Sequence, residues 1–177
     1  MDSDFLKAAV TAYWRYPRHC PLVALEVQDY NFREASAIPD IIVVTSDGYV
    51  IETEVKISMS DFRNDRKKQK HKFWRQSGSG YRPIHKFYFA VPFKLANQVA
   101  LKCEQLFPYA GVLGVEEPKF NHTWIHDAVK EYRRPRILGD RKLQVMEIAN
   151  MVRCQSATIC KLSEKIAKLT NGKTNND

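Results

Sequence analysis

The sequence has little of what would mark a disulfide-rich, zinc-binding or membrane protein. It contains four cysteines, and no two of them form a Cys-x-x-Cys pair. A disulfide framework or a structural zinc is therefore not expected, because a chain of this length can build a hydrophobic core without either. No apolar run approaches the roughly 18 residues of a membrane span. The start, Met1-Asp2-Ser3-Asp4, lacks the basic residues of a signal peptide. We expect a soluble cytoplasmic protein that does not contact a membrane.

Positive charge is abundant and unevenly distributed along the chain. The 177 residues include 28 Lys or Arg and 20 Asp or Glu, which gives a formal net charge of +8. Nine Lys or Arg and two Asp lie between Asp61 and Lys86, so this segment alone carries +7. A charge that served only solubility would be spread over the chain. The concentration predicts a surface for an anionic partner, with nucleic acid as the first candidate.

Hydrophobic periodicity predicts a mixed order of helices and strands. Helices are expected at residues 3–15, 60–77, 95–106 and 143–169. Strands are expected at residues 23–28, 38–45, 49–57, 86–91 and 111–115. Residues 116–139 show no regular pattern. The predicted fold is α/β, with a mixed central sheet of about five strands flanked by helices. Three regions are expected: one domain at 1–139, a C-terminal helical extension at 140–170 that packs on the core or contacts a second copy, and a disordered tail at 171–177.

Charged side chains occupy one face of the expected strand at 49–57. Because side chains alternate along a strand, Glu52, Glu54 and Lys56 share a face. Charges on a central strand are costly unless they are paired or bind a metal. The simplest alternative is a salt bridge in which Glu54 and Lys56 neutralise each other. That alternative leaves Glu52 and the nearby Asp40 unexplained.

The turn between two strands decides which face Asp40 joins. The segment Ser46-Asp47-Gly48 is a hairpin signal, and a three-residue loop with its glycine in the left-handed conformation would pair Thr45 with Tyr49. Asp40 would then lie opposite Glu54 and point to the same face. A two-residue turn would move Asp40 to the other face. We predict the three-residue loop or an equivalent bulge.

Two acids so placed favour a divalent cation. Carboxylates a few ångströms apart repel each other unless a cation lies between them. Oxygen ligands suit Mg²⁺, with Mn²⁺ as a substitute. Lys56 beside such an ion could position or deprotonate a water and offset charge in a transition state. The pattern predicts metal-assisted hydrolysis of a phosphodiester.

These residues resemble the PD-(D/E)XK nuclease superfamily. Pro39-Asp40, thirteen intervening residues and then Glu54-Val55-Lys56 match its motif. Four segments look like its MmcB-type branch of DNA-repair-associated and phage proteins: 38–43, 54–65, 86–92 and 111–115. The resemblance covers about residues 20–118. It implies a restriction-endonuclease-like core and cleavage to 5′-phosphate and 3′-hydroxyl products, in a bacterial or phage-infected cell.

The resemblance also implies roles for individual residues. Asp40 and Glu54 would bind the metal, and Lys56 would be the catalytic lysine. The family often adds an upstream acid, for which Glu26 is the tentative choice and Glu34 the second. Glu52 would lie just behind the metal ligands or, equally well, be exposed to solvent.

The basic segment after the strand is expected to be one helix that contacts phosphates. Its candidate DNA-binding residues are Arg63, Arg66, Lys67, Gln69, Lys70, Lys72 and Arg75. Phosphate contacts supply affinity without sequence preference. Gln69 could orient a water or a phosphate in the active site. A solvated charged face without a partner is the alternative.

The combined prediction is a Mg²⁺-dependent deoxyribonuclease that acts in DNA repair, recombination or phage DNA metabolism. A DNA-binding module of the same fold with little or no cleavage is one alternative, and an RNA-directed nuclease is another. A third is an interaction protein that uses its basic surface on an acidic partner. The stripe of Ile159, Leu162, Ile166 and Leu169 leaves a homodimer contact open.

Overall fold

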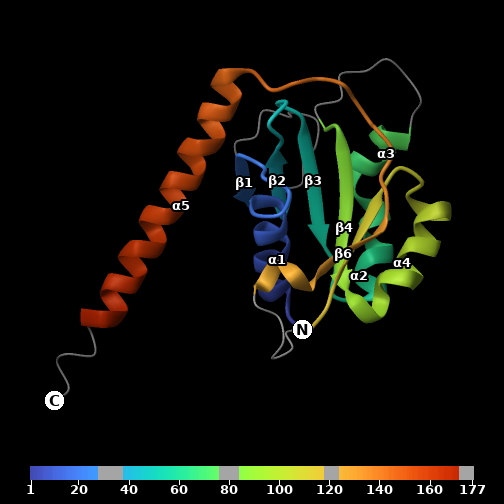
Figure 1. Ribbon diagram of the computed structural model, residues 1–177, viewed down its shortest axis with the longest axis horizontal. Coiled ribbons are helices and arrows are strands. Elements are labelled where there is room, and N and C mark those ends of the chain that lie inside the picture. The colour runs from blue at the N-terminus through green and yellow to red at the C-terminus, as the bar shows by residue number, and fades with distance from the viewer. Residues whose placement is uncertain (28–37, 76–83, 118–123, 172–177) are drawn as a thin grey trace.

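The computed structural model describes residues 1–27, 38–75, 84–117 and 124–171. The helices are α1 (Ser3–Arg15), α2 (Met59–Asn64), α3 (Gln69–Arg75), α4 (Phe93–Leu106) and α5 (Val145–Asn171), with the short 3-10 helices η1 (Asp65–Lys67) and η2 (Ile125–Ala128). The strands are β1 (Leu22–Leu25), β2 (Ile41–Val44), β3 (Val50–Val55), β4 (Lys86–Pro92), β5 (Gly111–Val115) and β6 (Val129–Arg133). Figure 1 shows the sheet with helices around it and α5 at one side.

The strands form one open mixed sheet in the order β1-β2-β3-β4-β5-β6. Strands β1, β2 and β3 are antiparallel neighbours, and β3, β4 and β5 run parallel. Strand β6 closes the other edge, antiparallel to β5. The α/β class with a mixed, helix-flanked sheet is therefore confirmed.

Among the described residues the sheet has six strands, one more than the five segments that periodicity predicted. Strand β6 lies in the stretch where no regular structure was predicted. Its charged residues Lys130 and Glu131 are exposed, as is common on edge strands, and they hide the apolar alternation. Tyr132 packs so closely on Gly114 of β5 that a Cβ there would meet its ring at 2.5 Å. Pairing with β5 and this contact hold the strand at the edge of the sheet.

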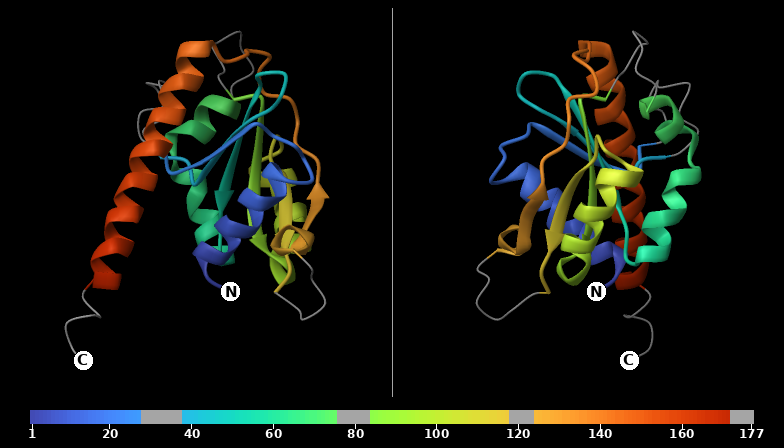
Figure 2. Two further views of the ribbon diagram at one scale, coloured as in Figure 1. Left: turned by 60° about the vertical axis from the view of Figure 1, so that its left-hand side comes forward. Right: turned by 90° about the vertical axis from the view of Figure 1, so that its right-hand side faces the viewer.

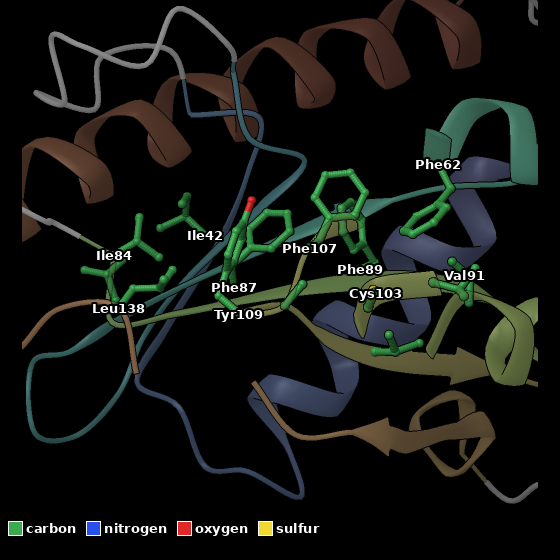
Figure 3. Packing of buried hydrophobic residues seen from close by; sticks show 14 of the residues in the cluster. Ile42, Phe62, Ile84, Phe87, Phe89, Val91, Cys103, Phe107, Tyr109 and Leu138 are labelled. Carbon is green, nitrogen blue, oxygen red and sulfur yellow. The ribbon is translucent and has the colours of Figure 1, made fainter. Parts of the chain in front are cut away.

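Each face of the sheet carries a separate apolar cluster. On one face, α1 and η2 cover the sheet with Leu6, Ala9, Val10, Trp14 and Ala128. On the other face, α2, α4 and the start of α5 contribute Phe62, Ala96, Val99, Cys103 and Met151. Figure 2 shows the helices on both sides, and Figure 3 shows Phe62, Phe89 and Phe107 gathered on the second face. The four cysteines are all free.

The β2–β3 hairpin has the predicted register. Thr45 N donates to Tyr49 O at 2.9 Å, and Gly48 has a left-handed φ of 83°. Ile41 therefore pairs with Thr53. The three-residue loop is confirmed, and the residue before Ile41 falls opposite the residue after Thr53.

Helix α5 begins later than predicted, at Val145, and is one unbroken helix. Its first half is attached to the domain by Met151, which is 1% exposed, and by Gln155, whose side-chain amide donates to Leu25 O at 3.1 Å. Within the described part of the chain, no helix combines the length and the apolar character needed to cross a membrane.

Candidate functional site

The site lies where β2 begins and β3 ends. The pairing of Ile41 with Thr53 puts Asp40 opposite Glu54, as predicted. Asp40 Oδ2 accepts a hydrogen bond from Val55 N at 2.8 Å, which fixes the carboxylate on β3. Burial raises the pKa of Asp40, and the charge of Glu54 raises it further. The two acids are thus close enough to repel each other electrostatically.

Glu26 lies beside Asp40, but a lysine holds it. Strand β1 ends at Leu25, and Glu26 takes a left-handed φ of 48° while its N–H donates to Asp40 O at 3.2 Å. Lys7 Nζ of α1 lies 2.5 Å from Glu26 Oε1 and 3.6 Å from Asp40 Oδ1. The Glu26 side chain is 62% exposed. The tentative third ligand is therefore near the site, with its carboxylate paired to Lys7. Glu34 lies outside the described residues.

Glu54 is the centre of a buried cluster of charges. It is 1% exposed, and its Oε2 lies 3.2 Å from Lys56 Nζ and 2.7 Å from Lys68 Nζ. Its Oε1 accepts from Lys70. Burial opposes ionisation, but Lys70, Lys56 and Lys68 together outweigh it and lower the pKa of Glu54. The carboxylate is consequently ionised and compensated by three ammonium groups.

Lys56 is held between two acids. Its Nζ lies 2.7 Å from Asp65 Oδ1 as well as 3.2 Å from Glu54. Burial favours the neutral amine, yet the charges of Glu54 and Asp65 prevail and raise the pKa of Lys56. At neutral pH the group is an ammonium. Of the two roles expected for Lys56, positioning and charge compensation fit this state, and proton removal does not.

The basic segment is not the continuous helix that was predicted. Helix α2 ends at Asn64 and η1 at Lys67, Lys68 has an extended ψ of 136°, and α3 starts anew at Gln69. The break brings Lys68, Lys70 and His71 to the inside. Asp65, which is 2% exposed, holds this geometry because its carboxylate bonds to Lys68 at 2.9 Å and to His71. Periodicity could not reveal the break, because it depends on a buried acid.

Asp65, His71 and Tyr109 form a relay that sequence reasoning missed. His71 is fully buried, with Nε2 on Asp65 and Nδ1 2.6 Å from the Tyr109 hydroxyl. Burial lowers the pKa of His71, whereas hydrogen bonds from His71 and Lys56 overcome burial to lower the pKa of Asp65. A neutral histidine thus donates to an ionised aspartate that in turn holds Lys56. The sequence feature that could have revealed this role is the position of Asp65, an acid within a segment that holds nine Lys or Arg residues.

The structure places Lys70 inside the protein, not on the predicted DNA-binding surface. Lys70 is 3% exposed and its Nζ lies 2.5 Å from Glu52 Oε1, besides contacting Glu54. Glu52 is 5% exposed, so it is not the solvent-facing acid of the alternative interpretation. Expecting Lys70 at the surface was wrong because the helix break rotates it onto β3.

The other predicted phosphate contacts remain available. The exposed members are Arg63, Arg66, Lys67, Gln69 and Lys72. The side chain of Arg75 lies outside the described part. Arg63, Arg66 and Lys67 line a cleft together with Lys102 of α4, and none of its described lining residues is acidic. We call it the basic cleft; Lys102 was not foreseen.

The oxygen ligands of the site are of the type that a divalent ion prefers, but the described residues do not supply a complete set of them. Asp40 and Glu54 offer the hard oxygen ligands that Mg²⁺ prefers. Among residues 1–27, 38–75, 84–117 and 124–171, however, no three His, Cys, Asp or Glu side chains are arranged to hold a metal. Both oxygens of Glu54 also face ammonium groups. Lys68, 33% exposed at its side chain, has the most freedom of the three to give way.

Comparison with known proteins supports the fold and goes no further. No family model and no curated protein matches the chain. Among solved structures, the SPO1766 protein of unknown function from Silicibacter pomeroyi is similar, with a TM-score of 0.55 and 15% identity. The match covers 92% of this chain and 88% of that one. At this identity the likeness concerns the arrangement of the elements alone.

Proposed function

We propose that this protein is a metal-dependent deoxyribonuclease of the cytoplasm. The observation that carries the proposal is the arrangement of Asp40, Glu54 and Lys56 at one end of a hairpin whose register was predicted from its turn. Two opposed carboxylates beside a fixed ammonium match the expected centre for phosphodiester hydrolysis.

Each side chain has a definable task in this proposal. Asp40 and Glu54 would hold Mg²⁺, which when bound would supply a Lewis acid and an activated water. Lys56, kept charged by Glu54 and Asp65, would orient a phosphate oxygen and offset negative charge as it grows. Asp65 would act indirectly, by fixing the ammonium.

The basic cleft supports a nucleic acid as the substrate. Its four cations lie on α2, η1 and α4. Lys67, the last of the three that come from the basic segment, directly precedes Lys68. Lys68 turns inward to Glu54 at 2.7 Å. Lys67 in the cleft and Lys68 on Glu54 are thus neighbours in the chain, and a cleft lined by cations favours binding of a phosphate backbone.

One observation favours a second candidate, a DNA-binding module of this fold with little or no cleavage. Glu54 is already compensated by three lysines, two of which, Lys68 and Lys70, come from the basic segment. A carboxylate so neutralised has less attraction for a cation. In this candidate the acids stabilise the segment that binds DNA.

Cleavage and binding assays separate the two candidates. Supercoiled plasmid and single-stranded DNA are incubated with the protein in Mg²⁺, in Mn²⁺ and in chelator, and DNA affinity is measured in chelator. We expect metal-dependent cleavage that is lost in Asp40→Asn and Lys56→Met, while affinity is kept. Asp47→Asn, an exposed acid in the same hairpin, is the matched control and should cleave normally. Binding without cleavage would establish the second candidate, and cleavage by Asp40→Asn would refute the proposed centre.

A further inference from the structure

Helix α5 carries an exposed apolar row along its whole length. Val145, Val152, Ile159 and Ile166 are spaced by seven residues and are 80%, 46%, 62% and 61% exposed. Seven residues make nearly two helical turns, so the four side chains lie along one side of the helix. At a rise of about 1.5 Å per residue, the row is about 30 Å long.

A second row completes a heptad pattern. Each residue of this second row lies three positions after a residue of the first row; its members are Ile148, Gln155, Leu162 and Leu169. The first row occupies the a positions and is entirely β-branched, and the second occupies the d positions and ends in two leucines. β-Branched residues at a with leucine at d favour parallel, two-stranded coiled coils. Leu162 is itself 55% exposed.

The domain covers only part of this surface. Met151 and Gln155 attach the first half of α5 to the sheet edge at β1. Beyond them α5 continues away from the sheet, as Figures 1 and 2 show from different sides. Ile159 and Leu162 lie in this projecting half and stay exposed. The apolar rows thus extend beyond what the domain itself can bury.

The residues that flank the rows favour a second copy of the chain as the partner. The heptad e and g positions up to residue 165 hold Ala149, Met151, Ser156, Thr158, Ser163 and Lys165. The only charge in this set is Lys165, and in a parallel pair a g residue adjoins an e residue of the other helix, not its own counterpart. An identical helix therefore meets no repulsion. At these positions an acidic partner would find one cation, Lys165.

We propose that α5 pairs with the α5 of a second copy of this chain in a parallel, two-stranded coiled coil. The shared surface consists of Val152, Ile159, Leu162 and Ile166, with Val145 at its start. This inference is independent of the proposed nuclease activity, because neither the acids nor the basic cleft take part in it.

Light scattering on the full chain, over a dilution series, tests the pairing. The wild type is expected at about twice the 20.5 kDa of one chain. Ile159→Lys should raise the dissociation constant at least about a hundredfold, since it places two ammonium groups in the seam. Met146→Lys, at a residue 70% exposed on the same helix but outside both rows, should leave it unchanged. A monomer at every concentration, or a dimer unaffected by Ile159→Lys, would overturn the proposal.

Cross-linking tests the orientation. In a Cys160→Ser background, Ile159→Cys should form a disulfide-linked dimer on mild oxidation, because equivalent a positions face each other in a parallel pair. Glu164→Cys, at an exposed residue on the outer side of the heptad, should not. A dimer that cross-links at Glu164→Cys and not at Ile159→Cys would contradict the parallel arrangement.

Discussion

Lys70→Met is the most informative single change in the buried charge cluster. The ammonium of Lys70 lies 2.5 Å from Glu52 and also bonds Glu54, and all three residues are at most 5% exposed. Methionine has a similar length and no charge, so packing is largely kept while Glu52 loses its ion pair. Removing one partner of a buried pair costs about 3–5 kcal/mol. That is a large part of the roughly 5–15 kcal/mol that stabilises an ordinary domain.

Urea unfolding at pH 7 measures this loss. For an m value of about 2 kcal/mol/M the midpoint should fall by about 2 M. Lys67→Met, in the same segment but exposed, is the matched control and should change the free energy of unfolding by less than about 0.5 kcal/mol. The loss in free energy of unfolding caused by Lys70→Met should become smaller as the pH is lowered. Burial already raises the pKa of Glu52, and a carboxyl with a raised folded-state pKa gains stability when it is protonated.

A double variant shows whether the pair itself is responsible. Glu52→Gln with Lys70→Met removes both charges, so the uncompensated acid is gone and more than about 1 kcal/mol should be recovered. A loss below about 1 kcal/mol for Lys70→Met, or a double variant as unstable as the sum of the singles, would refute the reasoning. Lys70 would then behave as a surface cation, as periodicity alone suggested.

Two further predictions concern the basic segment. Arg66→Glu with Lys67→Glu should weaken DNA binding and reduce the slope of log affinity against log salt by about 0.9 for each phosphate that is no longer neutralised; an unchanged slope would place the DNA elsewhere. Burial lowers the pKa of His71 below 6.5, so the folded state binds fewer protons than the unfolded state, and stability should fall as pH drops below 6.5. His71→Gln should flatten urea-unfolding stability between pH 6.5 and 5, and an unaltered slope would assign the loss to other groups.

The facing of the central acids could be read from local sequence. Side-chain alternation puts Glu52, Glu54 and Lys56 on one face, because a strand has a period of two. Gly48 fixes the register, because its left-handed conformation closes the three-residue turn that brings Asp40 opposite Glu54. Both properties involve residues close in the chain, so they can be predicted without knowledge of the rest of the fold.

The same local reasoning failed where distant residues compete. Periodicity predicted one helix through Lys70, but the helix is interrupted at Lys68. The interruption lets the buried Asp65 carboxylate bond Lys56, Lys68 and His71, and these contacts stabilise the folded chain more than a continuous helix would. Strand β6 was missed for a different reason, because its exposed Lys130 and Glu131 interrupt the apolar alternation that predicts a strand.

The sequence by itself determined the fold class, the hairpin register and the acids that face each other, because alternation and a glycine turn are short-range constraints. Only the tertiary structure decided which cations reach those acids. Three lysines that look alike along the chain end at different depths, with Lys67 exposed, Lys68 half-buried and Lys70 inside. Burial strengthens the electrostatic attraction within an ion pair and raises the free-energy cost of leaving a charge unpaired. Burial is a property of the assembled domain.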